Sequence, residues 1–109
     1  MQTTALGYLR VPTSTSDERV SQLERDIYAY AERQGMKLST LFADRSDEQT
    51  SGFSLLVDAL ERKESQHVIV PALHHFAHSP GMRLAIKELL EDRTGAEVIV
   101  MHPSPEEPS

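Results

Sequence analysis

The chain has 109 residues, the size of a single domain, and its 39% hydrophobic and 26% charged residues exclude a collagen-like or wholly disordered protein. The net charge of −6 argues against strong autonomous DNA binding, and no third of the chain has a net positive charge. The absence of cysteine excludes disulfides, thiolate nucleophiles and cysteine-ligated zinc. No apolar run has the ~18 residues of a membrane span, and the N-terminus does not resemble a signal peptide. We therefore expect a cytoplasmic protein without a membrane partner.

The first half of the chain alternates between strand-like and helix-like patterns. A mostly apolar run predicts a buried strand over residues 4–11, closed by Pro12. Apolar residues at helical spacing predict a helix over 17–34, with Thr15 and Glu18 as a capping box and Gly35 at its end. A second strand over 37–43 and a second helix over 52–64 follow.

The second half continues the alternation with a strand over 67–72, a helix over 80–93 and a strand over 96–101. Ser79 before Pro80 fits the start of the last helix, and Gly95 fits its end. We expect five apolar residues of this helix to face the core: Met82, Ala85, Ile86, Leu89 and Leu90. Residues 103–109 contain three prolines and two glutamates, so we expect a disordered tail.

This order of elements predicts an α/β fold, a single three-layer domain over residues 1–102. A mainly parallel four-stranded sheet in the order 2-1-3-4 would lie between helices on both faces. Functional sites in such sheets form at the carboxyl ends of the strands. Here these ends carry Arg10 to Thr13, Asp44 with Arg45, and the loop over 71–78.

Motifs at these ends resemble the catalytic domain of the serine recombinases, the resolvase and invertase family. Residues 8–13 are similar to the family's opening motif, tyrosine–x–arginine–valine–serine–threonine, and Phe42 with Asp44 resembles its second strand and acidic end. Further similarity lies in three segments: 29–35, 58–60 and 68–70. The resemblance covers roughly residues 4–102 and implies a resolvase-like fold. It also implies DNA recombination through a serine nucleophile, with arginines that stabilise the pentavalent phosphorus.

The chain departs from the family at the catalytic positions. Pro12 stands where the family has its nucleophilic serine, so no phosphoserine link can form there. The hydroxyls of residues 13–16 lie nearby, but a shift of one residue moves a side chain by about 3.3 Å and turns it to the other side of the backbone. The resemblance thus implies a degenerate site without catalytic residues, at these positions: Arg10, Pro12, Asp44, Thr50, His74, His75 and His78. Among them, Thr50 and the three histidines replace arginines and an aspartate of the family.

The histidines and Arg10 each allow two interpretations. His74 and His78 are four residues apart, so a helical turn would place them on one face, together with His75, and zinc or nickel could bind there. No glutamate or cysteine completes a known zinc spacing, and we expect a loop of neutral polar side chains, with no metal and no cofactor. Arg10 either holds a phosphate or sulfate or forms an ion pair with Asp44.

These patterns lead to three hypotheses on function. The favoured one is a catalytically inactive, stand-alone resolvase-like domain that acts as a protein-interaction or regulatory module, with a protein partner or as a homo-oligomer. The second is a serine-recombinase-family protein that takes part in DNA recombination with partner chains. The third is a small hydrolase whose metal is bound by His74, His75 and His78.

Overall fold

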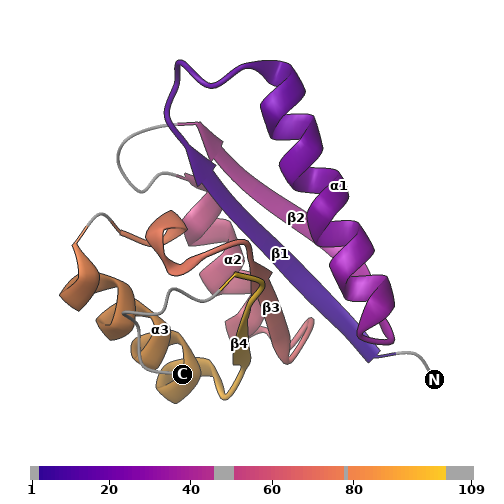
Figure 1. Cartoon of the computed structure of the whole chain (residues 1–109). Helices are drawn as coiled ribbons and strands as arrows, with labels where there is room; N and C mark the ends of the chain where they lie inside the picture. The colour runs from indigo at the N-terminus through magenta and orange to yellow at the C-terminus, as the bar shows by residue number, and fades with distance from the viewer. Residues whose placement is uncertain (1–2, 46–50, 78, 103–109) are drawn as a thin grey trace.

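Strands and helices alternate along the chain in a computed structural model that describes residues 3–45, 51–77 and 79–102 (Figure 1). The elements are β1 (Thr3–Val11), α1 (Asp17–Arg33), β2 (Met36–Arg45), α2 (Ser51–Glu61), β3 (His67–Val70), the 3-10 turn η1 (Leu73–His75), α3 (Pro80–Thr94) and β4 (Glu97–Val100). Thr50, His78 and the expected tail over 103–109 lie outside the described residues. In the part of the chain that the structure describes, no helix combines the length and apolar character needed to cross a membrane.

The four strands form one parallel sheet in the order β2-β1-β3-β4. This confirms the predicted α/β class and the predicted order 2-1-3-4. In Figure 1, α1 covers one face of the sheet, and α2 and α3 cover the other. The two central strands are β1 and β3, and their carboxyl ends lead into the loops before α1 and α3.

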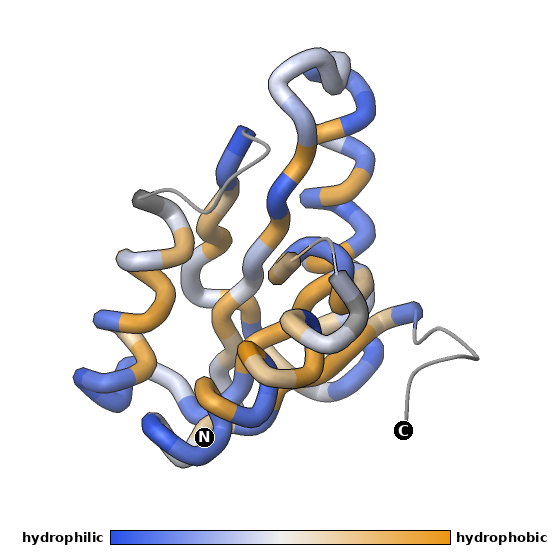
Figure 2. The backbone as a smooth tube through the Cα atoms, turned by 90° about the vertical axis from the view of Figure 1, so that its left-hand side faces the viewer, coloured by the Kyte–Doolittle hydropathy of each residue, from blue (hydrophilic) through white to orange (hydrophobic). Residues whose placement is uncertain are grey.

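Each face of the sheet has its own hydrophobic cluster, and Figure 2 shows the hydrophobic residues along the strands and at intervals along the helices. On the α1 face, Leu23 and Ile27 pack against Leu9 of β1. On the other face, Leu56 of α2 and Leu90 of α3 belong to the cluster around β1 and β3. Because both faces are covered, β1 is almost continuously buried from Ala5 to Val11, as expected of a central parallel strand.

The helix ends follow the sequence signals with one correction. Ser16, not Thr15, caps α1, because its side chain accepts a hydrogen bond from the Arg19 backbone N–H at 3.1 Å. Ser79 caps α3, with Pro80 at its first position. Gly35 and Gly95 both have a φ of 75°, the left-handed conformation that favours glycine after a helix.

The structure corrects the predicted core face of α3. Leu90 is buried and Ile86 is partly buried, as predicted. Met82 and Leu89, however, are 54% and 58% exposed, and Ala85 is also exposed. The helix is therefore rotated about its axis relative to the prediction.

Polar contacts at both ends of α3 account for this rotation. Near its start, Arg83 Nε donates to the Ala77 carbonyl oxygen at 2.9 Å. Near its end, the Glu91 carboxylate accepts from the Val98 backbone N–H at 3.1 Å. These bonds hold Arg83 against the preceding loop and Glu91 against β4, while part of the apolar stripe stays in solvent.

Candidate functional site

A cavity of about 600 Å³ lies at the carboxyl edge of the sheet, beside the ends of β1, β3 and β4. Three arginines from three different elements line it: Arg10 of β1, Arg19 of α1 and Arg83 of α3. We term this cavity the arginine pocket. Its other lining residues are Val11, Pro12, Thr15, Leu23, Asp26, Pro71, Ala72, His74, His75, Met101 and His102.

The arginine pocket brings together four of the seven positions singled out from the sequence: Arg10, Pro12, His74 and His75. This convergence follows from topology, because β1 and β3 are adjacent parallel strands whose carboxyl ends meet at one edge. Asp44 is not among the residues that line the pocket. Thr50 and His78 lie outside the described residues.

Arg10 forms two hydrogen bonds with the segment after β3 that contains His74 and His75, which we term the histidine loop. Its backbone N–H donates to Nδ1 of His75 at 2.9 Å, and its guanidinium donates to the His74 carbonyl oxygen at 3.3 Å. The residue is 8% exposed, so its charge is largely withdrawn from solvent. A carbonyl oxygen orients a guanidinium without cancelling its charge, and Arg10 therefore brings a positively charged group to the pocket wall.

His75 is a buried, neutral imidazole. Burial lowers its pKa from 6.5 to about 4, and the positive charge of Arg10 acts in the same direction. Since Nδ1 accepts the hydrogen bond from Arg10, the ring proton is on Nε2. His75 thus holds the end of β1 through its bond to the Arg10 backbone. The resemblance places a family arginine at the position of His75, but the neutral imidazole does not supply that positive charge at neutral pH.

Asp44 stabilises the start of α2. Its carboxylate accepts from the backbone N–H groups of Gly52 and Phe53 at 2.9 and 3.0 Å, and from the Tyr8 hydroxyl at 2.9 Å. Burial and this bond to Asp44 raise the pKa of Tyr8 above its ordinary value. The ion pair between Arg10 and Asp44 stays a prediction, because the bonds described for these two residues lead to different elements.

The cluster of positive charge is the feature that the sequence analysis missed. Charge sums over consecutive segments found no basic region, because the three arginines are distributed over residues 10 to 83. Among the described residues that line the pocket, Asp26 is the one acidic side chain, against three arginines. A signal was present in α1, where Arg19, Leu23 and Asp26 follow one another at helical spacing and so lie on one face.

Pro12 and Thr15 lie together where β1 leads into α1. The Thr15 backbone N–H donates to the Pro12 carbonyl oxygen at 3.0 Å, which forms a turn. Pro12 is exposed, and Thr15 is the one hydroxyl side chain among the described residues that line the pocket. The resemblance places the family's nucleophile at Pro12, which lines the pocket and whose ring has neither a hydroxyl nor an N–H group.

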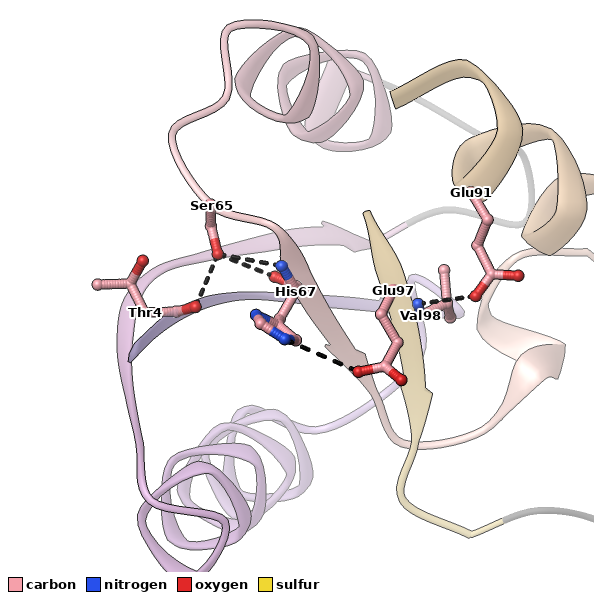
Figure 3. A network of polar contacts seen from close by, with 6 residues as sticks. All are labelled: Thr4, Ser65, His67, Glu91, Glu97 and Val98. Atoms are coloured by element: carbon pink, nitrogen blue, oxygen red, sulfur yellow. Dashed lines mark hydrogen bonds and ion pairs between the residues drawn. The ribbon is translucent and has the colours of Figure 1, made fainter. Parts of the chain in front are cut away.

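His67 is separate from the other histidines. It begins β3, at the opposite edge of the sheet, where Ser65 Oγ bridges the Thr4 carbonyl oxygen and the His67 backbone (Figure 3). Its Nε2 lies 3.8 Å from a carboxylate oxygen of Glu97, and its buried Nδ1 has no hydrogen-bond partner among the residues that the structure describes. These contacts join the starts of β1, β3 and β4, so His67 belongs to the sheet and not to the site.

No group of three or more metal-ligating side chains is found within residues 3–45, 51–77 and 79–102. The rings of His74 and His75 are close, with centroids 4.5 Å apart. Nδ1 of His75 is already engaged by the Arg10 backbone. The metal site on His74, His75 and His78 stays an untested hypothesis, since His78 is not described.

Comparisons with known proteins agree with this geometry. The family model described as "Resolvase, N terminal domain" matches residues 5–109. Comparison with the curated proteins gave no match. Among solved structures, the C-terminal catalytic domain of an IS607-like serine recombinase is 21% identical, with a TM-score of 0.81 over 94% of this chain and 73% of that chain.

Two further solved structures are similar in fold. A resolvase family site-specific recombinase from Streptococcus pneumoniae is 19% identical, with a TM-score of 0.73 over 92% of this chain and 72% of that one. A serine recombinase from Sulfolobus solfataricus is 16% identical, with a TM-score of 0.74 over 97% and 72%. At these identities the structural matches establish the fold alone.

Proposed function

Because this chain belongs to the family of resolvase N-terminal domains, we propose that it is a catalytically inactive member that acts as a protein-interaction or regulatory module. The observation that carries this proposal is the position of Pro12 in the arginine pocket, beside Arg10. A serine recombinase forms its covalent link through a serine oxygen, and proline has no such atom. The pocket therefore retains positive charge without a nucleophile at the family's position.

The other pocket residues do not replace the missing chemistry. Loss of the nucleophile from a catalytic unit lowers the rate on the order of 10⁶-fold. Thr15 has a hydroxyl, but its own backbone N–H closes a turn onto Pro12, and its carbonyl oxygen accepts a hydrogen bond from Arg45. It therefore belongs to the turn into α1, three residues beyond the nucleophile position of the family.

The exposed apolar side chains of α3 support the interaction part of the proposal. Met82, Ala85 and Leu89 are all exposed and recur at helical spacing, so they form one stripe along the outer side of the helix. Clustered apolar side chains on a surface are typical of a contact with another protein, whereas single ones are common everywhere. A protein partner or a second copy of the chain would cover this stripe.

A role in DNA recombination together with partner chains is the second candidate. The family match favours it, and so does the cluster of three arginines, since arginine is well suited to binding phosphate. In such a role a partner chain would supply the nucleophile. The two candidates differ in whether this chain itself becomes linked to DNA and in whether it binds duplex DNA alone.

We expect no covalent protein–DNA complex when the purified chain is incubated with supercoiled plasmid and with nicked suicide duplexes. The physical reason is the absence of an oxygen nucleophile at Pro12. Denaturing gels of the protein after nuclease treatment measure the link, and plasmid topology measures strand cleavage. An active serine recombinase domain serves as the positive control for both assays.

Two variants make this experiment specific. Pro12→Ser restores the hydroxyl at the family's position, and Thr15→Val removes the one pocket hydroxyl described nearby. We expect Pro12→Ser to remain inactive, because His74 and His75 stand where the family has an aspartate and an arginine. A covalent link in the wild-type chain that disappears in Thr15→Val would contradict the proposal of inactivity.

We also expect no measurable binding to duplex DNA at 0.15 M salt. Nonspecific affinity for DNA grows with the number of phosphates that a protein neutralises. This chain has a net charge of −6, and the three arginines that the fold brings together line a single pocket. Fluorescence anisotropy with a labelled duplex measures this directly. Micromolar or tighter binding near 0.15 M salt would favour the role in DNA recombination instead.

A further inference from the structure

The structure assigns a ligand class to the arginine pocket: we infer that it binds a small organic phosphomonoester of mononucleotide size, without covalent chemistry. The inference rests on the proposed catalytic inactivity, because a pocket without a nucleophile would bind the phosphate group of a ligand without forming a covalent bond to it. Three properties of the pocket lead to this class: its charge, its volume and its apolar wall.

The charge of the pocket matches a dianion. Among the described residues that line the pocket, three are arginines and one is an aspartate, which sum to a formal charge of +2 before any histidine is protonated. A phosphomonoester has a charge of about −1.5 to −2 at pH 7. A phosphodiester has only one negative charge, and so does a carboxylate. The arginines also come from three different elements, β1, α1 and α3, so the positive charge is contributed by more than one wall of the pocket.

Two of the arginines are held by the protein backbone. Arg10 donates to the His74 carbonyl oxygen, and Arg83 donates to the Ala77 carbonyl oxygen. Because these bonds fix the side chains before a ligand arrives, little conformational entropy is lost on binding. Arg19 differs, since it is exposed on the first turns of α1, at the outer side of the pocket.

The volume and the wall indicate an organic group beside the phosphate. A cavity of about 600 Å³ is within the range of pockets that hold drug-sized ligands and far larger than a phosphate ion requires. Its wall includes the apolar side chains of Val11, Leu23 and Met101. The imidazole rings of the exposed His74 and His102 add flat surfaces on which a base could stack.

Isothermal titration calorimetry of the whole chain with four compounds tests this inference. The compounds are AMP, adenosine, inorganic phosphate and cyclic AMP, which separate the phosphomonoester from the base, the free ion and the phosphodiester. We expect AMP to bind at least ~10-fold more tightly than each of the other three, because charge-assisted hydrogen bonds and apolar burial act together only in AMP. Equal affinity for AMP and adenosine would overturn the inference.

Matched variants of α1 locate the site. Arg19→Gln removes a pocket arginine at an exposed position, and we expect it to weaken AMP binding ~10-fold or more. Arg25→Gln removes the same charge from the same helix, at an exposed residue that does not line the pocket, and should change the affinity less than ~2-fold. Asp26→Asn removes the acidic side chain found among the described lining residues and should tighten binding. Equal losses in Arg19→Gln and Arg25→Gln would show a nonspecific charge effect and overturn the assignment.

A further ligand separates free mononucleotides from DNA ends. A short single strand with a 5′-phosphate has the same phosphomonoester, and an unphosphorylated strand is its control. Preference for the strand over AMP would overturn the assignment of a mononucleotide-sized ligand. The outcome is independent of strand cleavage: DNA cleavage by the chain would contradict the proposed inactivity, whereas absence of AMP binding contradicts only this inference.

Discussion

Replacing Asp44 with alanine is expected to lower the free energy of unfolding by about 3–5 kcal/mol, which is a large part of the total stability of a small domain. The Asp44 side chain accepts hydrogen bonds from the Tyr8 hydroxyl and from the Gly52 and Phe53 backbone N–H groups, which are all described residues. Its loss removes the side-chain acceptors at the start of α2 and leaves the buried Tyr8 hydroxyl without this partner. Urea unfolding, followed by circular dichroism, measures the change.

Two matched variants test whether this effect comes from the buried position. Asp58→Ala removes an exposed aspartate in α2 and should change the stability by less than about 0.5 kcal/mol. Gly52→Ala leaves the carboxylate in place, but its Cβ would lie 2.6 Å from an Asp44 oxygen and must displace it. We therefore expect Gly52→Ala to destabilise the protein as well. A similar loss in Asp44→Ala and Asp58→Ala would contradict this account.

Removing the hydroxyl of Tyr8 refines the test. Tyr8→Phe alone should destabilise the protein by about 1–2 kcal/mol, because the carboxylate of Asp44 loses one donor. In the Asp44→Ala background, the same change should be neutral or stabilising, since it removes a buried donor that has lost this acceptor. A double-mutant cycle measures this coupling, and strictly additive losses would show that the bond contributes nothing.

The arrangement of the sheet was predictable from the sequence because it depends on features with a clear period. Runs of apolar residues and helical spacing alternate, and one apolar strand, over residues 4–11, is buried on both faces. The adjacency of Pro12 and the histidine loop then follows from parallel topology, without knowledge of side chains.

The rotation of α3 was not predictable in this way. Its apolar residues form a plausible inward face, but the bonds of Arg83 to the loop and of Glu91 to β4 decide which side faces the sheet. A periodic pattern shows that a helix has an apolar side. It does not weigh that side against polar side chains that bond to the backbone of the preceding loop and of the following strand.

The arginine pocket was hidden for a related reason. Arg19 and Arg83 begin the helices that follow β1 and the histidine loop, and such helix starts lie at the carboxyl edge of a parallel sheet. Counting charges along the chain separates these residues, whereas the fold gathers them. The role of Asp44 could not be predicted from the sequence either, because it depends on donors in β1 and α2 that the fold brings to the end of β2.

The stability of the protein is expected to fall by about 3 kcal/mol as the pH decreases from about 6.5 to 4, through His75 alone. Burial lowers the pKa of His75 to about 4, whereas the unfolded chain has the ordinary value of 6.5. Above pH 6.5 the imidazole is neutral in both states, and its contribution is fully present. Below 6.5 the unfolded chain binds a proton that the folded protein does not bind, so the unfolded state gains stability until the folded pKa is reached.

His75→Asn isolates this contribution from the titration of carboxylates. An asparagine side-chain oxygen can still accept the hydrogen bond from the Arg10 backbone, but it does not titrate. We therefore expect wild-type protein to lose about 3 kcal/mol more than the variant between pH 6.5 and 4, measured by urea unfolding at each pH. NMR of the His75 ring should show an apparent pKa near 4 in the folded protein. Parallel pH profiles of the two proteins would contradict this account, and so would a His75 ring that titrates near 6.5. Either result would show that burial beside Arg10 does not keep the imidazole neutral.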